Sequence, residues 1–230
     1  MSSKMKSLAC VVAQQQFKLK IEKYCAYSEA LEKLLEFEFA KVMTNELIAN
    51  LKSVARDEIE SEPSDELLAL RDDFPTILRG SLFVYVASAF QNAAYRFITE
   101  CYEIPTRIVN EKESPLLGKG GNLSQVADVL VYNKICAKND FVIGRLKQYK
   151  HIRDSFAHVE GSVTNELYSP ESVHNAAKEL PGVIVHKLAH EDEPNKKLRS
   201  LGRFELTQHF MPEAAEFFRN AFAVLSKTPK

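Results

Sequence analysis

One segment of the chain, residues 76–102, is apolar on almost every side of the helix that its spacing predicts. A helix that is apolar all round is buried on all sides, so this segment has to lie at the centre of the fold. Its longest apolar run, residues 81–90, is far shorter than the about 20 residues that cross a bilayer. The positions that carry the pattern are Leu78, Leu82, Phe83, Val86, Phe90, Phe97 and Ile98.

Helical spacing of apolar residues recurs on both sides of this central segment. It predicts helices over residues 11–38, 43–58, 123–135, 140–158 and 212–226, with short helices after Ser64 and from Ser169 to about Leu180. The stretch 104–122 holds Pro105, Pro115 and three glycines, a composition typical of a surface loop.

Strand-like residues occur late in the chain, in GVIVHKL (182–188) and in GRFELTQHF (202–210). The first is β-branched and the second alternates, which together indicate a small hairpin. The sequence therefore predicts an all-α fold, with an N-terminal helical extension (1–64) and a helical domain (65–230). A small β-hairpin would precede the last helix.

Charge and cysteine usage narrow the class of protein. The formal net charge is -1, whereas proteins that coat nucleic acid usually carry a basic excess. An enzyme that engages RNA locally needs only a local basic patch. The four cysteines form no CxxC pair and no zinc-finger spacing, and the N-terminal residues show no secretory signal. We expect four reduced thiols in a cytoplasmic protein.

An arginine followed by a histidine five or six positions later occurs three times in this chain. The pairs are Arg145 with His151, Arg153 with His158, and Arg203 with His209. Spacing alone selects none of them, because a short pattern that recurs has little specificity. Only Arg153 continues as RDSFAHVEG, with a small residue before the histidine and a glycine three residues after it.

The stretch YKHIRDSFAHVEG resembles the signature of HEPN domains (higher eukaryotes and prokaryotes nucleotide-binding). The matching positions are Arg153, Asp154, Ala157, His158 and Gly161. The apolar helix upstream is also similar to the first core helix of that family, although Gln91 stands where many members carry a glutamate. The resemblance covers roughly residues 75 to 225.

This resemblance implies a HEPN-like helical bundle, usually dimeric, and in many members a metal-independent endoribonuclease. Arg153 and His158 would be catalytic, with Asp154 in support and no cofactor or metal. Asp154 replaces the commonest asparagine and adds a negative charge beside the phosphate site. Such domains often act as toxins or in defence against phage. The resemblance therefore implies an RNA substrate and an antitoxin or defence-system protein as partner, and it implies no association with a membrane.

The residue types suit RNA cleavage, because RNA supplies its own nucleophile in the 2′-hydroxyl. A histidine with a pKa of about 6.5 transfers protons at neutral pH, and the planar fork of an arginine matches phosphate oxygens. Asp154 would orient the imidazole or hold the arginine. Five residues of unbroken helix put Arg153 and His158 about 140° apart. Either the helix bends or ends between them, or Arg153 reaches round, or a two-fold interface brings two chains together.

Other candidate sites and one other function stay open. His186, His190 and the acidic run 191–193 are potential metal ligands, but an acidic loop is more often simply solvated. LGKGGN (117–122) lacks the order of a phosphate-binding loop. Lys147 and Lys150 are possible phosphate contacts. The alternative function is a non-catalytic HEPN-like module that binds a protein partner or a nucleotide.

Overall fold

The computed structural model describes residues 3–54, 70–71, 74–102, 104, 106–109, 112–115, 117, 122–159, 162–163, 175, 177–186 and 202–226. These residues are mostly helical, which confirms the expected all-α class with a hairpin before the last helix. The elements are α1 (Ser3–Val54), α3 (Phe74–Cys101), β1 (Thr106–Val109), β2 (Lys112–Pro115), α4 (Leu123–Tyr132), α5 (Phe141–Val159), β3 (Ser162–Val163), β4 (Val183–His186), β5 (Gly202–Leu206) and α7 (Phe210–Leu225).

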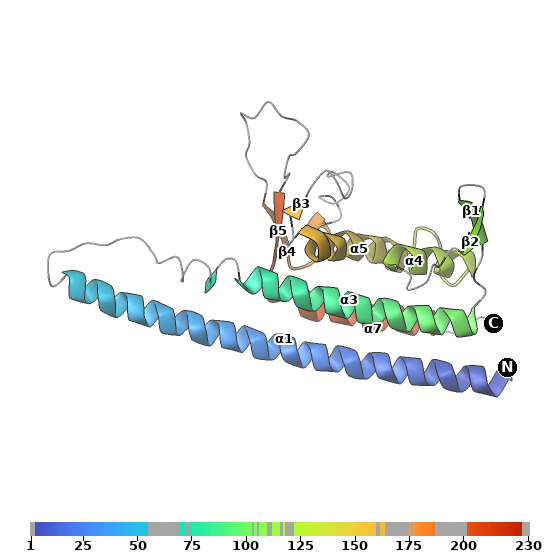
Figure 1. Cartoon of the computed structure of the whole chain (residues 1–230), viewed down its shortest axis with the longest axis horizontal. Helices are drawn as coiled ribbons and strands as arrows, with labels where there is room; N and C mark the ends of the chain where they lie inside the picture. Colours follow the sequence, from blue (N-terminus) through green and yellow to red (C-terminus); the bar gives the residue numbers. More distant parts are fainter. Residues whose placement is uncertain are drawn as a thin grey trace, which may run out of the picture.

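The central helix is α3, which confirms its expected position. Burial on all sides is wrong, because Ser81, Tyr85 and Arg96 are exposed along one face of the helix. It contacts α1, α4, α5 and α7, and it lies between α1 on one side and α5 on the other (Figure 1). Pro75 sits in its first turn, where the missing N–H costs nothing. No described helix has an apolar stretch of the length and purity that would carry it through a bilayer.

Aromatic rings from four helices fill the core around α3. Phe83 and Phe90 contact Phe218 of α7, with ring centroids 6.3 and 4.8 Å away. Tyr149 of α5 lies 5.6 Å from Phe83, and Phe17 of α1 lies 5.7 Å from Phe90. The same ring stack thus positions α1, α5 and α7 against one helix.

The N-terminal helix α1 is a single element, so the expected break between residues 38 and 43 is wrong. The intervening residues, Phe-Ala-Lys-Val, include no helix breaker, and apolar spacing alone does not show whether two helical patterns join. Phe17 and Ile21 belong to the same core as α3. The expected boundary at residue 64 lies outside the described residues and stays a prediction.

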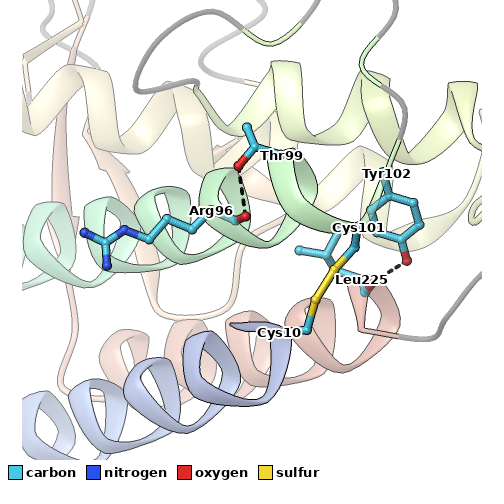
Figure 2. Close-up of a disulfide and its surroundings, with 6 residues drawn as sticks. All are labelled: Cys10, Arg96, Thr99, Cys101, Tyr102 and Leu225. Carbon is cyan, nitrogen blue, oxygen red and sulfur yellow. Dashed lines mark hydrogen bonds between the residues drawn. A yellow bond between two sulfur atoms is a disulfide. The ribbon is translucent and has the colours of Figure 1, made fainter. Parts of the chain in front are cut away.

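A disulfide joins the N-terminal part of α1 to the end of α3, between Cys10 and Cys101 (Figure 2). The expectation of four reduced thiols is therefore wrong for these two residues, while Cys25 and Cys136 are free. The two partners are 91 residues apart, and no local spacing reveals such a pair. Only the antiparallel packing of α1 on α3 brings them together.

Arg79 links three elements through one shielded guanidinium group. Its Nε and Nη2 each donate to a carboxylate oxygen of Glu32 on α1, at 2.7 Å, and its Nη1 donates to the carbonyl of Leu206 at 2.7 Å. The side chains of Arg79 and Glu32 are only 15% and 19% exposed. The fork-to-fork geometry satisfies both charges, which a buried pair requires.

The strand predictions succeed in one place and fail in another. β4 and β5 pair antiparallel, as expected, and β3 adds to the other edge of β5. The stretch 104–122, expected to be a loop, instead contains the antiparallel pair β1–β2. Each strand has only four residues, so the alternation of apolar and polar side chains that would predict a strand is too short to recognise.

The remaining helices follow the sequence closely. Asn122 caps α4, and its side chain and that of Gln125 form a reciprocal capping box. α5 and α7 start and end within two residues of the expected positions. The short helix expected after Ser64 and most of the one from Ser169 lie outside the described residues.

Gly80 marks the closest approach of α3 to α5. A Cβ atom added there would lie 2.1 Å from Cδ1 of Phe156, whereas one added at Gly144 of α5 would meet nothing within 4 Å. The absence of a side chain at Gly80 therefore lets Phe156 pack directly on the backbone of α3.

The substitution Gly80→Ala is expected to lower the free energy of unfolding by about 1–3 kcal/mol, because the new methyl group displaces Phe156. The matched substitution Gly144→Ala should raise it by about 0.4–1 kcal/mol, since it only restricts the unfolded chain. Urea denaturation followed by circular dichroism measures both. Equal effects of the two substitutions would contradict the close packing at Gly80.

The substitution Glu32→Gln is expected to cost about 1.5–3 kcal/mol, because Arg79 keeps its charge in a shielded place and loses an ionic acceptor. Glu36→Gln, one turn further along α1 and exposed, is the control, with a change within about 0.5 kcal/mol. Thermal denaturation of both variants at one protein concentration makes the comparison. A Glu32→Gln variant as stable as the control would show that Arg79 does not depend on this contact.

Candidate functional site

The RDSFAH motif lies in the last turns of α5, which runs unbroken from Phe141 to Val159. The helix therefore neither bends nor ends between Arg153 and His158. Leu146, Tyr149 and Ile152 are buried against the core, and they fix which side of α5 faces outward. The C-terminal end of α5 lies beside the sheet formed by β3, β5 and β4 (Figure 1).

Asp154 is the centre of the polar cluster in the motif. The residue is only 7% exposed, and its carboxylate accepts from Arg153 Nη1 at 2.8 Å and from Lys150 Nζ at 2.7 Å. The side chains of Arg153 and Lys150 are themselves 27% and 15% exposed. A shielded carboxylate needs such partners, because an unpaired charge there would be costly.

Lys150, Asp154 and His158 are spaced four residues apart, so they line one face of α5, which we call the α5 stripe. His158 is exposed at the end of this stripe. Arg153 starts from a different face of the helix, but its guanidinium turns to Asp154. Of the three arrangements that the helix geometry left open, the structure excludes a helix that ends between the two residues. The described contacts join Arg153 to Asp154 and not to His158, so the other arrangements stay predictions.

Arg153 keeps hydrogen-bonding capacity after this contact. Its Nε is buried and has no hydrogen-bond partner in the described structure. A guanidinium has five N–H donors, and one of them is committed to Asp154 through Nη1. The Nη2 donors are therefore the ones that an anion approaching the α5 stripe could contact, because the Nε–H group is buried.

Arg145 and His151, the first of the other two arginine–histidine pairs, make contacts within the fold. Arg145 donates to the carbonyl of Glu179 at 2.6 Å and lies over the ring of Phe141, 4.9 Å from its centroid, so it has a packing role. Its partner in the pattern, His151, is half-buried. Burial lowers the pKa of His151, the charge of Lys150 lowers it further, and Asp154 acts in the opposite direction.

Arg203, which sequence spacing pairs with His209, lies near the RDSFAH motif in the structure. It lies in β5, opposite Ser162 of β3 and His186 of β4 in the register. Ser162 follows His158 by only four residues, so the pairing of β3 with β5 brings Arg203 to the end of α5. A two-residue strand gives no sequence signal, which is why this proximity was not predicted.

The expected phosphate contacts and metal ligands are only partly described. Lys147 Nζ lies 3.8 Å from Oδ1 of Asp128 on α4, and both side chains are more than 40% exposed. His186 lies 2.7 Å from Glu205. Within the described ranges, no three His, Cys, Asp or Glu side chains come together as a metal site. Residues 187–200, with His190 and the acidic run, lie outside those ranges, as do residues 118–121 of the glycine-rich stretch.

Comparisons with protein-family models, with curated proteins and with solved structures found no match for this chain. The HEPN resemblance therefore stands on the motif residues and on the apolar helix that precedes them.

The lowered pKa of His151 makes the stability of the fold dependent on pH. The unfolded chain binds a proton near the ordinary value of 6.5, and the folded chain binds it only at lower pH. The free energy of unfolding should therefore fall as the pH drops below about 6.5. Chemical denaturation between pH 7.5 and 5 should show a smaller loss for His151→Gln than for wild type. Equal slopes in the wild-type and His151→Gln proteins would contradict the assignment.

Proposed function

We propose that the C-terminal half of α5 is the catalytic surface of a metal-independent endoribonuclease. The observation that supports the proposal is the contact of Arg153 with Asp154, which brings a guanidinium toward the face that carries the exposed His158. Cleavage of an RNA phosphodiester requires a cation and a proton-transfer group, and here the cation is partly shielded whereas the histidine is exposed.

In the proposed reaction, His158 accepts the proton of the ribose 2′-hydroxyl as its oxygen attacks the phosphorus. The bond from phosphorus to the 5′-oxygen breaks, and the 5′-oxygen leaves with a proton from water or from a second histidine. The products are a 2′,3′-cyclic phosphate and a 5′-hydroxyl. The unused donors of Arg153 stabilise the extra negative charge on the phosphate oxygens in the transition state.

Asp154 would be a positioning residue in this scheme. Its carboxylate holds the guanidinium of Arg153 and the ammonium of Lys150, so both cations keep a defined place without RNA. Arg203 at the end of α5 adds a further cation for the phosphate backbone. This local basic group fits an enzyme whose net charge is only -1.

The wider biological role follows from the resemblance. We propose a cytoplasmic enzyme that acts as a toxin or as an anti-phage effector and is restrained by a partner protein. In that case, production of the wild-type chain without its partner would arrest cell growth, and production of His158→Ala would not.

A non-catalytic, protein-binding role is the alternative, and one observation favours it. The negative charge of Asp154 already neutralises one of the two cations that it contacts, so the cluster is consistent with a purely structural ion pair. The RNA assay separates the two functions.

In that assay, the purified chain is incubated with total RNA and a chelator, and the ends of the fragments are analysed. We expect cyclic-phosphate ends, and a rate at least about 100-fold lower for both Arg153→Ala and His158→Ala. His209→Ala, which removes another exposed histidine, is the control and should cleave like wild type. Cleavage that persists unchanged in the His158→Ala and Arg153→Ala proteins would exclude the proposed site. A wild-type protein without activity on any RNA would favour the alternative.

A further inference from the structure

Opposite its buried face, α1 carries a row of exposed apolar residues, among which Lys23 and Lys41 also lie. Ala13, Phe17 and Ile21 are buried against the rest of the chain. On the opposite side, Leu19 and Phe37 are each 65% exposed. We define the outer face of α1 by the exposed residues Leu8, Val12, Leu19, Ala26, Ala30, Leu34, Phe37 and Ile48.

The outer face follows a regular helical repeat. Leu8, Leu19 and Ala30 are spaced by eleven residues, and so are Ala26, Phe37 and Ile48. An eleven-residue repeat corresponds to about 3.67 residues per turn, close to the 3.6 of a straight helix. These positions therefore stay on one side of α1 over nearly its whole length.

The C-terminal part of α1 also extends past the other helices of the described residues. Arg79 contacts Glu32, and α3 begins five residues before Arg79, at Phe74. Because the two helices are antiparallel, α1 runs on beyond the start of α3 from about residue 37, as Figure 1 shows. A helix with an apolar outer face and an overhang of this kind is typical of a helix that pairs with another chain.

The distribution of charges along α1 favours a second copy of the same chain as the partner. Residues 3–28 contain five lysines and one glutamate, whereas residues 29–54 contain five glutamates and three lysines. The helix is therefore basic in its N-terminal half and acidic in its C-terminal half. A second copy that runs antiparallel places each basic half beside an acidic half, whereas a parallel copy places like charges together.

We propose that the outer face of α1 binds the outer face of a second copy of this chain, antiparallel and about a two-fold axis. Centring the pair between Ala26 and Ala30 puts the small residues at the axis, where they allow the helices to approach closely. Leu19 then lies opposite the partner subunit's Phe37. At the flank of the same contact, Lys20 lies beside the partner subunit's Glu38.

This interface is separate from the proposed RNA-cleaving surface. α3 and α7 lie between α1 and α5, so the pair leaves one α5 stripe on each outer side (Figure 1). The dimer predicted from the HEPN resemblance shares a cleft at the motif, whereas this dimer does not. The inference stands whether or not the protein cleaves RNA.

Sedimentation equilibrium of the full chain tests the proposal. The wild-type protein should be a dimer, and the double variant Leu19→Glu/Phe37→Glu should sediment as a monomer with its helical circular dichroism retained. Tyr132→Glu, at an exposed apolar position on α4, is the control and should stay dimeric. A wild-type monomer at all concentrations, including one that binds lipid vesicles instead, would overturn the proposal, as would a double variant that remains a dimer.

Charge exchange tests the antiparallel direction even if the first double variant does not fold. Lys20→Glu and Glu38→Lys should each weaken the dimer by about 3- to 30-fold, because the pair occurs twice in a symmetric dimer. The combined Lys20→Glu/Glu38→Lys protein should recover the wild-type dissociation constant. Recovery supports the antiparallel pairing, because in a parallel dimer in register Lys20 and the partner subunit's Glu38 would lie about 27 Å apart along the helices. Absence of recovery overturns it.

Discussion

The burial of α3 around most of its circumference is the constraint on which the rest of the structure depends. Its rings at Phe83 and Phe90 are fully buried, and they contact aromatic side chains of α1, α5 and α7. Burial of an aromatic side chain is among the largest favourable contributions to folding, so ring contacts fix α1, α5 and α7 against α3. The close approach at Gly80 and the contacts of Arg79 follow from this packing, because both residues lie on the same helix.

Packing around α3 also places charges where water has little access, and each is compensated in a specific way. Arg79 is matched by the carboxylate of Glu32 and a backbone carbonyl, which accept from three of its five N–H donors. Asp154 is matched by two cations, and one of these, Arg153, keeps a buried donor without a partner. The Arg79 contact is bidentate and adds a backbone acceptor, whereas Arg153 donates to Asp154 through Nη1 alone among the described contacts.

Local patterns in the sequence were sufficient for most of the helices, for the β4–β5 hairpin and for the central position of α3. They also selected RDSFAHVEG among three similar pairs, on context rather than spacing. They were not sufficient for the continuity of α1, where two helical patterns join without a breaker. They also missed β1 and β2, whose pairing depends on short backbone contacts.

The sequence by itself determined which segments are helical and which residue types stand at the candidate site, because periodicity and motif context are local properties of the chain. Only the tertiary structure decided that Cys10 meets Cys101, that Arg203 lies at the end of α5, and that Arg153 turns to Asp154. The first two depend on packing between segments distant in sequence. The last depends on which side of α5 the core covers, because burial leaves Asp154 in need of cations and so directs the arginine toward it.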